Sequence, residues 1–318
     1  MSTALPTIDD INAAAKRIKG LVHETPLLSC ETIDDLFQAE ILFKCENFQK
    51  VGAFKSRGAC NAVFSLPQEQ VSRGVGTHSS GNHAQALARA ASLRNTMAYI
   101  VMPDTAPRVK VEAVKHYGGK ITFCKPTLES REQTLNEIIK ETGAVEIHPY
   151  NDYRIIAGQA TAALEIFKET GELDIIMAPV GGGGLLSGTA LATRYISPET
   201  RVIAAEPAMA DDACRSFHEG KFIPSENPRT IADGLLTSLG TLTYPIIREY
   251  VDDILTVSEN SIVEAMRLIW ERMKIIIEPS AAVPLGSLLE KKLDIKNKRV
   301  AIILSGGNVN LDKLPWIK

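Results

Sequence analysis

Short apolar runs alternate with longer amphipathic stretches along most of the chain. The apolar runs predict strands, whereas the amphipathic stretches show the 3.6-residue period of helices. The predicted strands span residues 41–43, 74–77, 97–102, 120–123, 145–148, 175–180, 202–205, 254–257 and 300–304. The predicted helices include residues 107–117, 131–142, 160–170, 260–273 and 281–290. Strands that alternate with helices predict a parallel sheet covered by helices, and therefore an α/β fold.

The sequence shows no flexible connection between separate domains. No internal repeat, low-complexity tract or Ser/Pro-rich linker interrupts it, so two domains would share an extensive interface. Residues 74–150 form a compact predicted unit of alternating strands and helices, flanked by segments that are also α/β. We therefore expect a small inserted α/β domain at 74–150 and a large domain made of 1–73 and 151–318. Ligands of such sheets bind at the carboxyl ends of the strands.

Composition and charge limit the kinds of molecule that this protein is expected to bind. The 318 residues carry a formal net charge of -3 and are 45% hydrophobic, with a pI near 6.1 and a mean hydropathy of -0.01. This balance is typical of a soluble globular protein and provides no basic surface for nucleic acid. The N-terminus lacks the features of a secretion signal, and no stretch has the length of a membrane span. The five cysteines are scattered without a CxxC pair, so we expect reduced thiols in a cytoplasmic protein.

The densest unusual sequence is IIMAPVGGGGLLSG at residues 175–188. A buried strand is predicted to run into four consecutive glycines, Gly181 to Gly184, and then into an apolar helix start. Four glycines allow a loop whose N–H groups all face one small anion at a helix N-terminus. The Lys-Ser/Thr pair of a P-loop and the GxGxxG pattern are both missing. We therefore predict a phosphate-binding loop, with a merely flexible turn as the alternative.

Two further loops follow predicted strands and are rich in short polar residues. Residues 77–85 read THSSGNHAQ, and residues 304–310 read LSGGNVN. A run of this kind that opens a helix presents backbone donors and short side chains to a ligand carboxylate. A Ser N-cap with solvated neighbours is the plainer interpretation of the first loop, but it accounts for one residue only.

Lys55 lies in the run VGAFKSRGA, between Phe54 and residues that should start a helix. A single lysine is nearly always a solvated charge. Here we expect it close to the loops described above, where removal from water would lower the pKa of its amine. A deprotonated lysine amine forms imines with carbonyl cofactors. Lys55 is therefore a candidate for that chemistry.

Four motifs together resemble one family. They are AFKSRGA with Lys55, SSGNHAQ at 79–85, the tetraglycine loop and LSGGNVN at 304–310. The chain resembles the fold type II pyridoxal-phosphate enzymes, whose fold is that of the tryptophan synthase beta chain, and within them the serine racemase and serine/threonine dehydratase family. The resemblance runs from Thr25 to Asn310. It implies two open, twisted parallel-sheet α/β domains with pyridoxal 5'-phosphate between them.

The resemblance also implies roles for residues around the cofactor. Lys55 would form the internal Schiff base and act as the base on one face of the substrate Cα. Phe54 would cover one face of the cofactor ring, and Asn82 would hydrogen-bond its phenolic oxygen. Ser305 would meet the pyridine nitrogen. The phosphate would be held by Gly181, Gly182, Gly183, Gly184 and Leu185.

The implied reaction begins with removal of the Cα proton from a β-hydroxy amino acid. Racemisation needs a second acid/base group opposite Lys55, and Ser80 occupies that position of serine racemases, although Ser80 is equally suited to be a helix N-cap. The substrate carboxylate would be met by Ser79, Asn82 and His83, and Gly234 would flank the amino and hydroxyl groups. We expect a serine racemase that also eliminates water from serine or threonine to give a 2-oxo acid and ammonia.

Two alternatives stay open at this point. One is a dedicated ammonia-lyase for L-threonine or L-threo-3-hydroxyaspartate, since relatives that mainly dehydrate also carry the serine at position 80. The other is a non-catalytic phosphate- or nucleotide-binding α/β protein. Arg154 could read the second carboxylate of hydroxyaspartate, although a surface arginine is the plainer interpretation.

The resemblance extends to regulation and assembly. Glu206, Asp212 and the carbonyl of Ala210 match the divalent-cation site of serine racemases, whose hard oxygen ligands suit Mg²⁺ or Ca²⁺; an ordinary acidic turn is the alternative. ATP is a candidate effector: matches to the nucleotide site stand at Gln85, Tyr117, Lys274 and Asn308, and departures at Cys30 and Glu31. The family also suggests a homodimer.

Overall fold

The chain folds around two separate sheets, and the computed structural model describes residues 4–79, 81–106 and 108–316. The larger sheet has six strands in the order β1-β2-β10-β7-β8-β9, all parallel except β1, which runs antiparallel to β2. Its strands are β1 (Leu27–Leu28), β2 (Glu40–Cys45), β7 (Ile175–Pro179), β8 (Arg201–Pro207), β9 (Asp253–Val257) and β10 (Arg299–Leu304).

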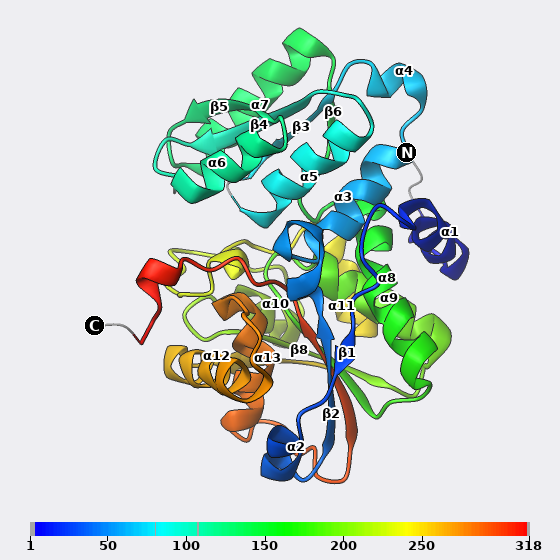
Figure 1. The fold of residues 1–318 in the computed structure, drawn as a ribbon, viewed down its shortest axis with the longest axis vertical. Helices are drawn as coiled ribbons and strands as arrows, with labels where there is room; N and C mark the ends of the chain where they lie inside the picture. The colour runs from blue at the N-terminus through cyan, green and yellow to red at the C-terminus, as the bar shows by residue number, and fades with distance from the viewer. Residues whose placement is uncertain (1–3, 80, 107, 317–318) are drawn as a thin grey trace.

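The smaller sheet has four parallel strands in the order β5-β4-β3-β6. They are β3 (Val75–His78), β4 (Ala98–Pro103), β5 (Lys120–Cys124) and β6 (Val145–Glu146). Figure 1 shows this sheet in the upper half of the molecule and the six-stranded sheet in the lower half. The predicted α/β class with parallel sheets is confirmed.

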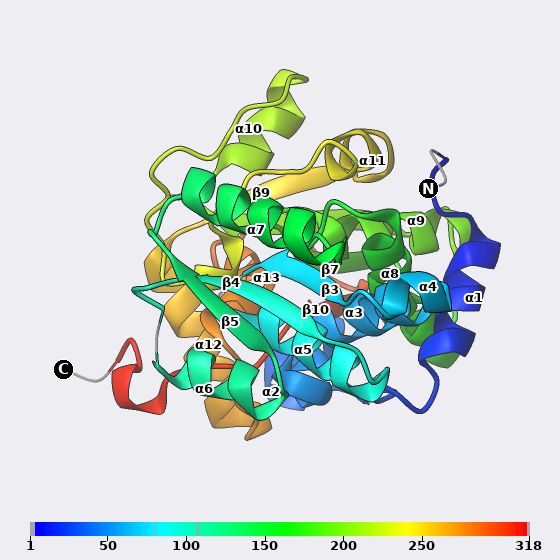
Figure 2. The same ribbon diagram turned by 90° about the horizontal axis from the view of Figure 1, so that it is seen from above.

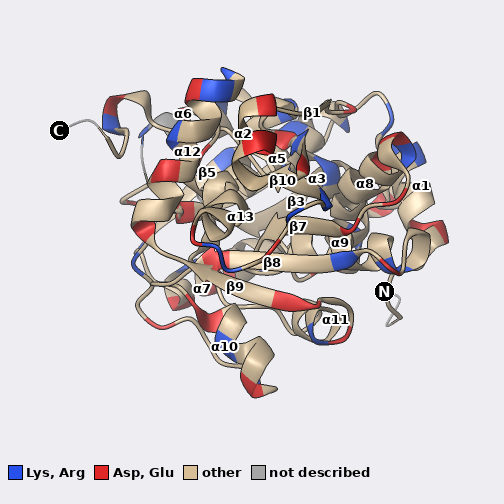
Figure 3. Cartoon of the chain, turned by 90° about the horizontal axis from the view of Figure 1, so that it is seen from below, with Lys and Arg blue, Asp and Glu red and all other residues tan. Residues whose placement is uncertain are grey.

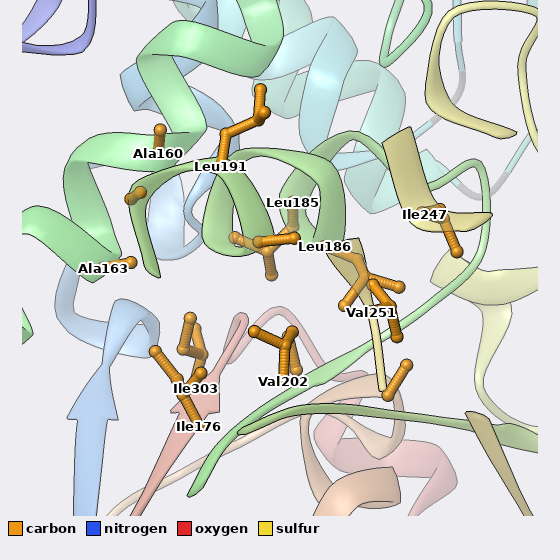
Figure 4. Close-up of a cluster of buried hydrophobic side chains, with 14 of the residues drawn as sticks. Ala160, Ala163, Ile176, Leu185, Leu186, Leu191, Val202, Ile247, Val251 and Ile303 are labelled. Carbon is orange, nitrogen blue, oxygen red and sulfur yellow. The ribbon is translucent and has the colours of Figure 1, made fainter. Parts of the chain in front are cut away.

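Helices cover both faces of the larger sheet. Along β7, Ile176 and Ala178 point to one hydrophobic cluster, whereas Ile175 and Met177 point to another. Figure 4 shows the first cluster, in which α8, α9 and α11 pack on the sheet, and α12 and α13 pack on the opposite face. Because both faces are buried, the strands are continuously apolar rather than alternating.

The α-helices have the following bounds: α1 (Ile8–Ile18), α2 (Glu31–Phe37), α3 (Lys55–Phe64), α4 (Gln68–Val71), α5 (Asn82–Leu93), α6 (Arg108–His116), α7 (Leu128–Thr142), α8 (Tyr153–Thr170), α9 (Gly184–Ile196), α10 (Asp212–Glu219), α11 (Thr243–Tyr250), α12 (Glu259–Met273) and α13 (Pro279–Leu289). Short 3-10 turns occupy Glu46–Phe48, Lys50–Gly52, Asp233–Leu235 and Leu311–Lys313.

Several element ends carry recognisable local signals in the sequence. Ser258 is the N-cap of α12, where its hydroxyl accepts from the N–H of Ser261, and Gly143 ends α7 in the left-handed conformation. The two-residue strand β1 and the helices α1, α2, α4, α10 and α11 were not among the predicted elements. A capping box between Thr7 and Asp10 marks the start of α1 in the sequence. The predicted helix start at Pro107 falls outside the described residues.

All four strands of the smaller sheet come from residues 74–150, and we propose that this segment is the inserted domain and that 1–73 and 151–318 form the large one. Helix α3 connects the two halves, because its residues Ala59, Cys60 and Val63 pack into the same hydrophobic cluster as Val75 and Leu87. Charges of both signs are interspersed over the elements (Figure 3). Among the described residues, no helix has the length and apolarity needed to span a membrane.

Candidate active site

Lys55 is the first residue of α3 and is partly buried. Its Nζ donates to the carbonyl oxygen of Pro149 at 3.0 Å and lies 4.9 Å from the centroid of the Phe54 ring. Burial lowers the pKa of the amine to about 8, although the carboxylate of Glu278 opposes this shift. The expectation of a desolvated lysine near the loops is therefore supported by the position of its side chain.

Lys55 lies beside the loop that follows β10. Strands β2 and β10 are parallel neighbours, so their carboxyl ends meet at one edge of the sheet. There the N–H of Phe54 donates to the carbonyl of Ser305 at 3.1 Å, and Ala53 pairs with Gly306 in an isolated bridge. Ser305 is buried, with 3% of its surface exposed. The topology thus brings Phe54, Lys55 and Ser305 together from opposite ends of the chain.

Glu278 is a site residue to which the sequence analysis gave no role. Its carboxylate accepts from Asn82 Nδ2 at 3.0 and 3.2 Å and from the N–H of Asn308 at 3.2 Å. Asn308 Nδ2 in turn donates to Asn82 Oδ1 at 2.9 Å. Burial raises the pKa of Glu278 to about 7 despite these donors. A lone acidic residue in the apolar run KIIIEPSAAV was the available signal.

The four glycines connect β7 to α9. Gly183 is the N-cap of α9 and has φ of 86°, in the left-handed region that favours glycine. A methyl group on Gly182 would lie only 2.3 Å from the Tyr150 ring. None of the N–H groups of residues 181–185 donates to another residue that the structure describes. These free donors at a helix N-terminus form a cup suited to an anion.

Tyr150 bridges the lysine and the glycine loop. Its neighbour Pro149 accepts from Lys55, and its own ring packs against Gly182. His148 lies edge-on to Tyr150, with ring centroids 4.6 Å apart, and its Nδ1 accepts from the N–H groups of Tyr150 and Asn151 at 3.3 and 2.9 Å. The aromatic ring of Tyr150 therefore lies against the anion cup.

Two histidines, His83 and His148, lie near Lys55, and a third, His78, lies edge-on to His148. Burial lowers the pKa of His83 to about 3 and the pKa values of His78 and His148 to about 4, so all three are neutral at pH 7. His83 Nε2 lies 3.1 Å from the carbonyl oxygen of Ile147, which makes Nε2 the donor. Its buried Nδ1 has no partner among the described residues. A hydrogen-bond acceptor is thus available beside the lysine.

The other predicted substrate contacts lie on neighbouring loops. Ser79 follows β3, and its hydroxyl accepts from the N–H of Gly81 at 3.4 Å. Gly234 donates its N–H to Ser280 Oγ at 3.1 Å, and its carbonyl lies next to Gly181. Ser80, predicted as the second acid/base group, lies outside the described residues. Leu185 is in the first turn of α9.

The predicted cation ligands lie at the carboxyl end of β8. Glu206 and Asp212 are buried, with 1% and 2% of their surfaces exposed. Burial raises the pKa of Glu206 to about 9 and that of Asp212 to about 6, and Asp212 Oδ2 has no partner among the described residues. Ala210 lies in the turn between them, where its N–H donates to Pro207. The burial of both carboxylates distinguishes them from an ordinary, solvated acidic turn.

Comparison with known protein families matches residues 18–306 to the family described as pyridoxal-phosphate dependent enzyme. The chain belongs to this family. It is 50% identical over 312 residues to a β-hydroxyaspartate dehydratase of Paracoccus denitrificans, covering 98% of this chain and 99% of that one. It is also 50% identical over 319 residues to a serine racemase of Dictyostelium discoideum, covering 99% and 98%. The structure of maize serine racemase superposes with a TM-score of 0.95 at 47% identity, covering 97% of this chain and 95% of that one.

Membership in the pyridoxal-phosphate dependent enzymes confirms the predicted fold type II architecture, and pyridoxal phosphate is the cofactor of the family. The residues present fit this cofactor. The glycine cup offers unpaired N–H groups to a phosphate, and the buried Lys55 offers an amine of lowered pKa to its carbonyl. A non-catalytic phosphate-binding protein would need no such amine.

The residues matched to a nucleotide site are only partly connected. Asn308 belongs to the Glu278 network described above, and Lys274 Nζ donates to the carbonyl of Glu271 at 2.6 Å. Gln85 is buried, with 8% of its surface exposed. No hydrogen bond joins Gln85, Tyr117 and Lys274 within the described part of the chain.

Arg154 makes a local ion pair. Its Nη2 lies 2.6 Å from Asp152 Oδ2, and its Nε donates to the same carboxylate at 3.0 Å. Asp152 is also the N-cap of α8, so the pair is fixed at a helix start. Arg154 was expected to be a plain surface arginine; its side chain is instead partly buried and held by this pair.

The pKa of Lys55 predicts how the apoenzyme recaptures its cofactor. Below pH 8 the rate of covalent attachment should rise about tenfold per pH unit, because only the deprotonated amine attacks, and it should level off above pH 8. In Glu278→Gln the plateau should begin at lower pH, because the carboxylate that favours the ammonium form is gone. Stopped-flow absorption of apoenzyme mixed with pyridoxal phosphate measures this rate. A plateau reached only near pH 10.5 would mean an ordinary solvated lysine.

Proposed function

We propose that this chain is a serine racemase that interconverts L- and D-serine and also eliminates water from serine or threonine, giving a 2-oxo acid and ammonia. The observation that carries the proposal is the buried Lys55 amine, with a pKa of about 8, beside the anion cup of the glycine loop. The 50% identity to a serine racemase over nearly the whole chain supports the choice of reaction. The proposed substrate is a small β-hydroxy amino acid.

Lys55, Phe54, Asn82 and Ser305, with the glycine cup, are the residues that we propose to hold pyridoxal phosphate. When bound, this cofactor supplies a carbonyl for covalent attachment of an amine and a ring that stabilises negative charge at the substrate Cα. Asn82 Nδ2 carries two hydrogens, and Glu278 takes one of them. The second is free to reach the phenolic oxygen of the ring. Gly181 to Gly184 and Leu185 donate N–H groups to the phosphate.

The start of helix α5 is proposed to bind the substrate carboxylate. Ser79, Asn82 and His83 lie at this helix N-terminus, whose dipole favours an anion. His83 acts there as a neutral hydrogen-bonding group, because burial keeps its pKa near 3. Gly234 leaves room beside the amino and hydroxyl groups. Lys55 then takes the Cα proton from one face, and Ser80 exchanges a proton with the other face.

The function is tested by following both products from L-serine. We expect chiral chromatography to show D-serine, and a coupled assay to show pyruvate and ammonia. Ser80→Ala should lower racemisation by about a hundredfold or more, the contribution of one acid/base group, while leaving part of the deamination. Ser79→Ala is the matched control, because Ser79 is proposed to bind the carboxylate and should affect both reactions equally. Equal loss of both reactions in Ser80→Ala, or no D-serine from the unaltered enzyme, would contradict the assignment.

A dedicated hydroxyaspartate ammonia-lyase is the second candidate. It is favoured by the equal 50% identity to a β-hydroxyaspartate dehydratase. Arg131, in the first turn of α7, also makes no ion pair with a carboxylate among the described residues, and its charge acts on His78 and Tyr150. Arg131 is therefore better placed than Arg154 to bind a second substrate carboxylate. A kcat/KM for L-threo-3-hydroxyaspartate at least tenfold above that for L-serine, without D-serine formation, would establish this candidate.

We also propose that Glu206, Asp212 and the Ala210 carbonyl bind Mg²⁺ or Ca²⁺. No group of three or more His, Cys, Asp or Glu side chains suited to a metal occurs among the described residues, so the carbonyl and water would complete the shell. The support is the burial of both carboxylates and the unpartnered Asp212 Oδ2.

Removal of the cation should destabilise the protein through this site. When the Mg²⁺ concentration is a hundred times its Kd, binding stabilises the folded state by about 2.7 kcal/mol. A chelator that removes the cation should therefore lower the Tm by several degrees. Asp212→Asn should make the Tm insensitive to Mg²⁺. Asp211→Asn is the control, because Asp211 pairs with Arg215 at the surface and should leave the response intact. If the two variants respond alike, the cation binds elsewhere.

The assembly and location proposals rest on less specific features. We propose a cytoplasmic homodimer that binds neither nucleic acid nor membrane. All five cysteines are free thiols, which suits a reducing compartment. ATP is a candidate effector, and activity measured at fixed Mg²⁺ with and without ATP tests it. Light scattering of the purified enzyme tests the dimer.

A further inference from the structure

Helix α10 carries a thiol and an imidazole that the proposed reaction does not use. Cys214 and His218 are four residues apart and therefore lie on the same side of the helix. Cys214 Sγ is 3.3 Å from His218 Nδ1. Figure 2 shows α10 projecting from the body of the molecule beside β9. The pair thus lies at the periphery of the protein.

Asp253, the first residue of β9, fixes the protonation of the imidazole. His218 Nε2 lies 2.9 Å from Asp253 Oδ1, so Nε2 carries the proton and donates it to the carboxylate. The lone pair of Nδ1 then faces the thiol. Histidines that ligate metals have this same arrangement, with one nitrogen on the metal and the other held by a carboxylate.

Ile254 adds a third donor atom. Its carbonyl oxygen is 3.2 Å from Cys214 Sγ. Strand β9 is the edge of the six-stranded sheet, and the N–H of Ile254 bonds to Asp253 Oδ1 rather than to a neighbouring strand. Because the N–H and C=O of one residue in a strand point to the same side, this carbonyl also lies at the open edge. A sulfur, a nitrogen and an oxygen therefore converge there.

The spacing and surroundings suit a cation. In tetrahedral zinc, with Zn–S of about 2.3 Å and Zn–N of about 2.0 Å, the sulfur and nitrogen are about 3.5 Å apart. The carboxylate of Asp253 faces the imidazole and that of Glu206 accepts from the Cys214 N–H, and both attract a divalent cation. The His218 and Asp253 side chains are 53% and 37% exposed, so a cation can enter from solvent.

We propose that Cys214 Sγ, His218 Nδ1 and the Ile254 carbonyl bind a thiophilic divalent cation such as Zn²⁺ or Cd²⁺, with water in the remaining position. Binding forms a metal–sulfur bond and releases the thiol proton to solvent, with no change of oxidation state. This site differs in chemistry from the oxygen-only site proposed at Glu206 and Asp212. The two are adjacent, since the N–H of Cys214 donates to Glu206 Oε1 at 2.5 Å.

The test uses Cd²⁺ itself with the full-length holoenzyme in excess Mg²⁺, which occupies any oxygen-only site. We expect calorimetry to show one Cd²⁺ per chain, together with the ultraviolet charge-transfer band of a thiolate bound to Cd²⁺. Cys214→Ser should lose the band. His218→Gln should bind at least tenfold more weakly, and Asp253→Asn about tenfold more weakly, as when a carboxylate behind a metal-bound histidine is removed. Cys124→Ser, which alters another partly exposed thiol, should bind as the unaltered enzyme does.

Several outcomes would overturn the proposal. They are a band that persists in Cys214→Ser, no band in the unaltered enzyme, and displacement of Cd²⁺ by Mg²⁺. Unchanged Cd²⁺ affinity in His218→Gln would show that the Cys214 thiol binds the metal without the imidazole. If Cys214→Ser folds poorly, His218→Gln still tests the proposal. Its replaced side chain is largely exposed, so this variant should fold normally.

Discussion

Lys55→Ala should lower kcat for both racemisation and elimination by a factor of about 10⁴ or more, because the variant loses the covalent anchor of the cofactor and the base in one step. The pKa of about 8 gives Lys55 a much larger fraction of neutral, attacking amine near pH 7–8 than an ordinary lysine has, and the Pro149 carbonyl holds its side chain in place. The visible absorption of covalently held pyridoxal phosphate should disappear with the activity. Steady-state kinetics and absorption spectra of the dialysed variant measure both effects.

Lys50→Ala is the matched control for this experiment. Lys50 lies five positions earlier, in the 3-10 turn that precedes α3, and its backbone carbonyl accepts from the Ser56 hydroxyl of α3. It should keep the activity and the spectrum. Turnover and a visible band that both survive in Lys55→Ala would refute the proposed function. Because the Cys214 and His218 site is measured by Cd²⁺ binding alone, that inference would stand independently of such a failure.

Arg57→Met should destabilise the fold by about 3–5 kcal/mol, the usual effect of removing one partner from a buried ion pair. The guanidinium is fully buried and contacts Glu46 at 2.8 Å and Glu165 at 2.6 and 2.7 Å. Lys44 completes the network at 2.7 Å from Glu165. Burial alone would raise the pKa of Glu46, but Arg57, together with Thr25 and Lys44, more than offsets it and holds that pKa below its usual value. Without Arg57, Glu46 is a buried charge with too little compensation.

Urea denaturation and thermal melting measure the loss of stability. Arg267→Met is the control, because Arg267 and Glu271 form an exposed pair, 3.0 Å apart, that should contribute less than about 1 kcal/mol. Arg57→Lys should also be destabilised, since a single ammonium cannot contact both carboxylates as the planar guanidinium does. A melting temperature of Arg57→Met equal to that of Arg267→Met would show that the network adds nothing to stability. Arg57 is two residues after Lys55, so the network also anchors the helix that carries the lysine.

The sequence was informative wherever a feature depends on neighbours along the chain. The alternation of strands and helices, the N-cap at Ser258 and the left-handed Gly183 all follow from local periodicity and backbone preference. The glycine loop could be assigned to an anion before any relative was considered, because unpaired N–H groups at a helix start need no distant partner. The Lys55 motif was local too, and its resemblance to a family gave it a role.

Long-range partners could not be predicted in this way. Glu278 joins Asn82 across 196 positions, and Arg57 joins Glu165 across 108. Arg57 reaches Glu165 because α3 packs against α8, and Glu278 lies beside the loop after β10, where its N–H donates to the carbonyl of Gly306. Neither arrangement leaves a local pattern in the sequence. The same holds for Asp253, which reaches His218 only because α10 packs against the edge strand β9.

The sequence by itself therefore determined the α/β class and the positions of most strands, and it indicated a candidate anion-binding loop and the lysine on which the proposed chemistry depends. Only the tertiary structure decided the environment of each charge: Lys55 and Glu278 in a buried site that shifts both pKa values toward neutrality, and Arg154 in a local pair with Asp152. The physical reason is that burial and charge pairing depend on which distant segments fold against a residue. Its neighbours in the chain specify only the local backbone.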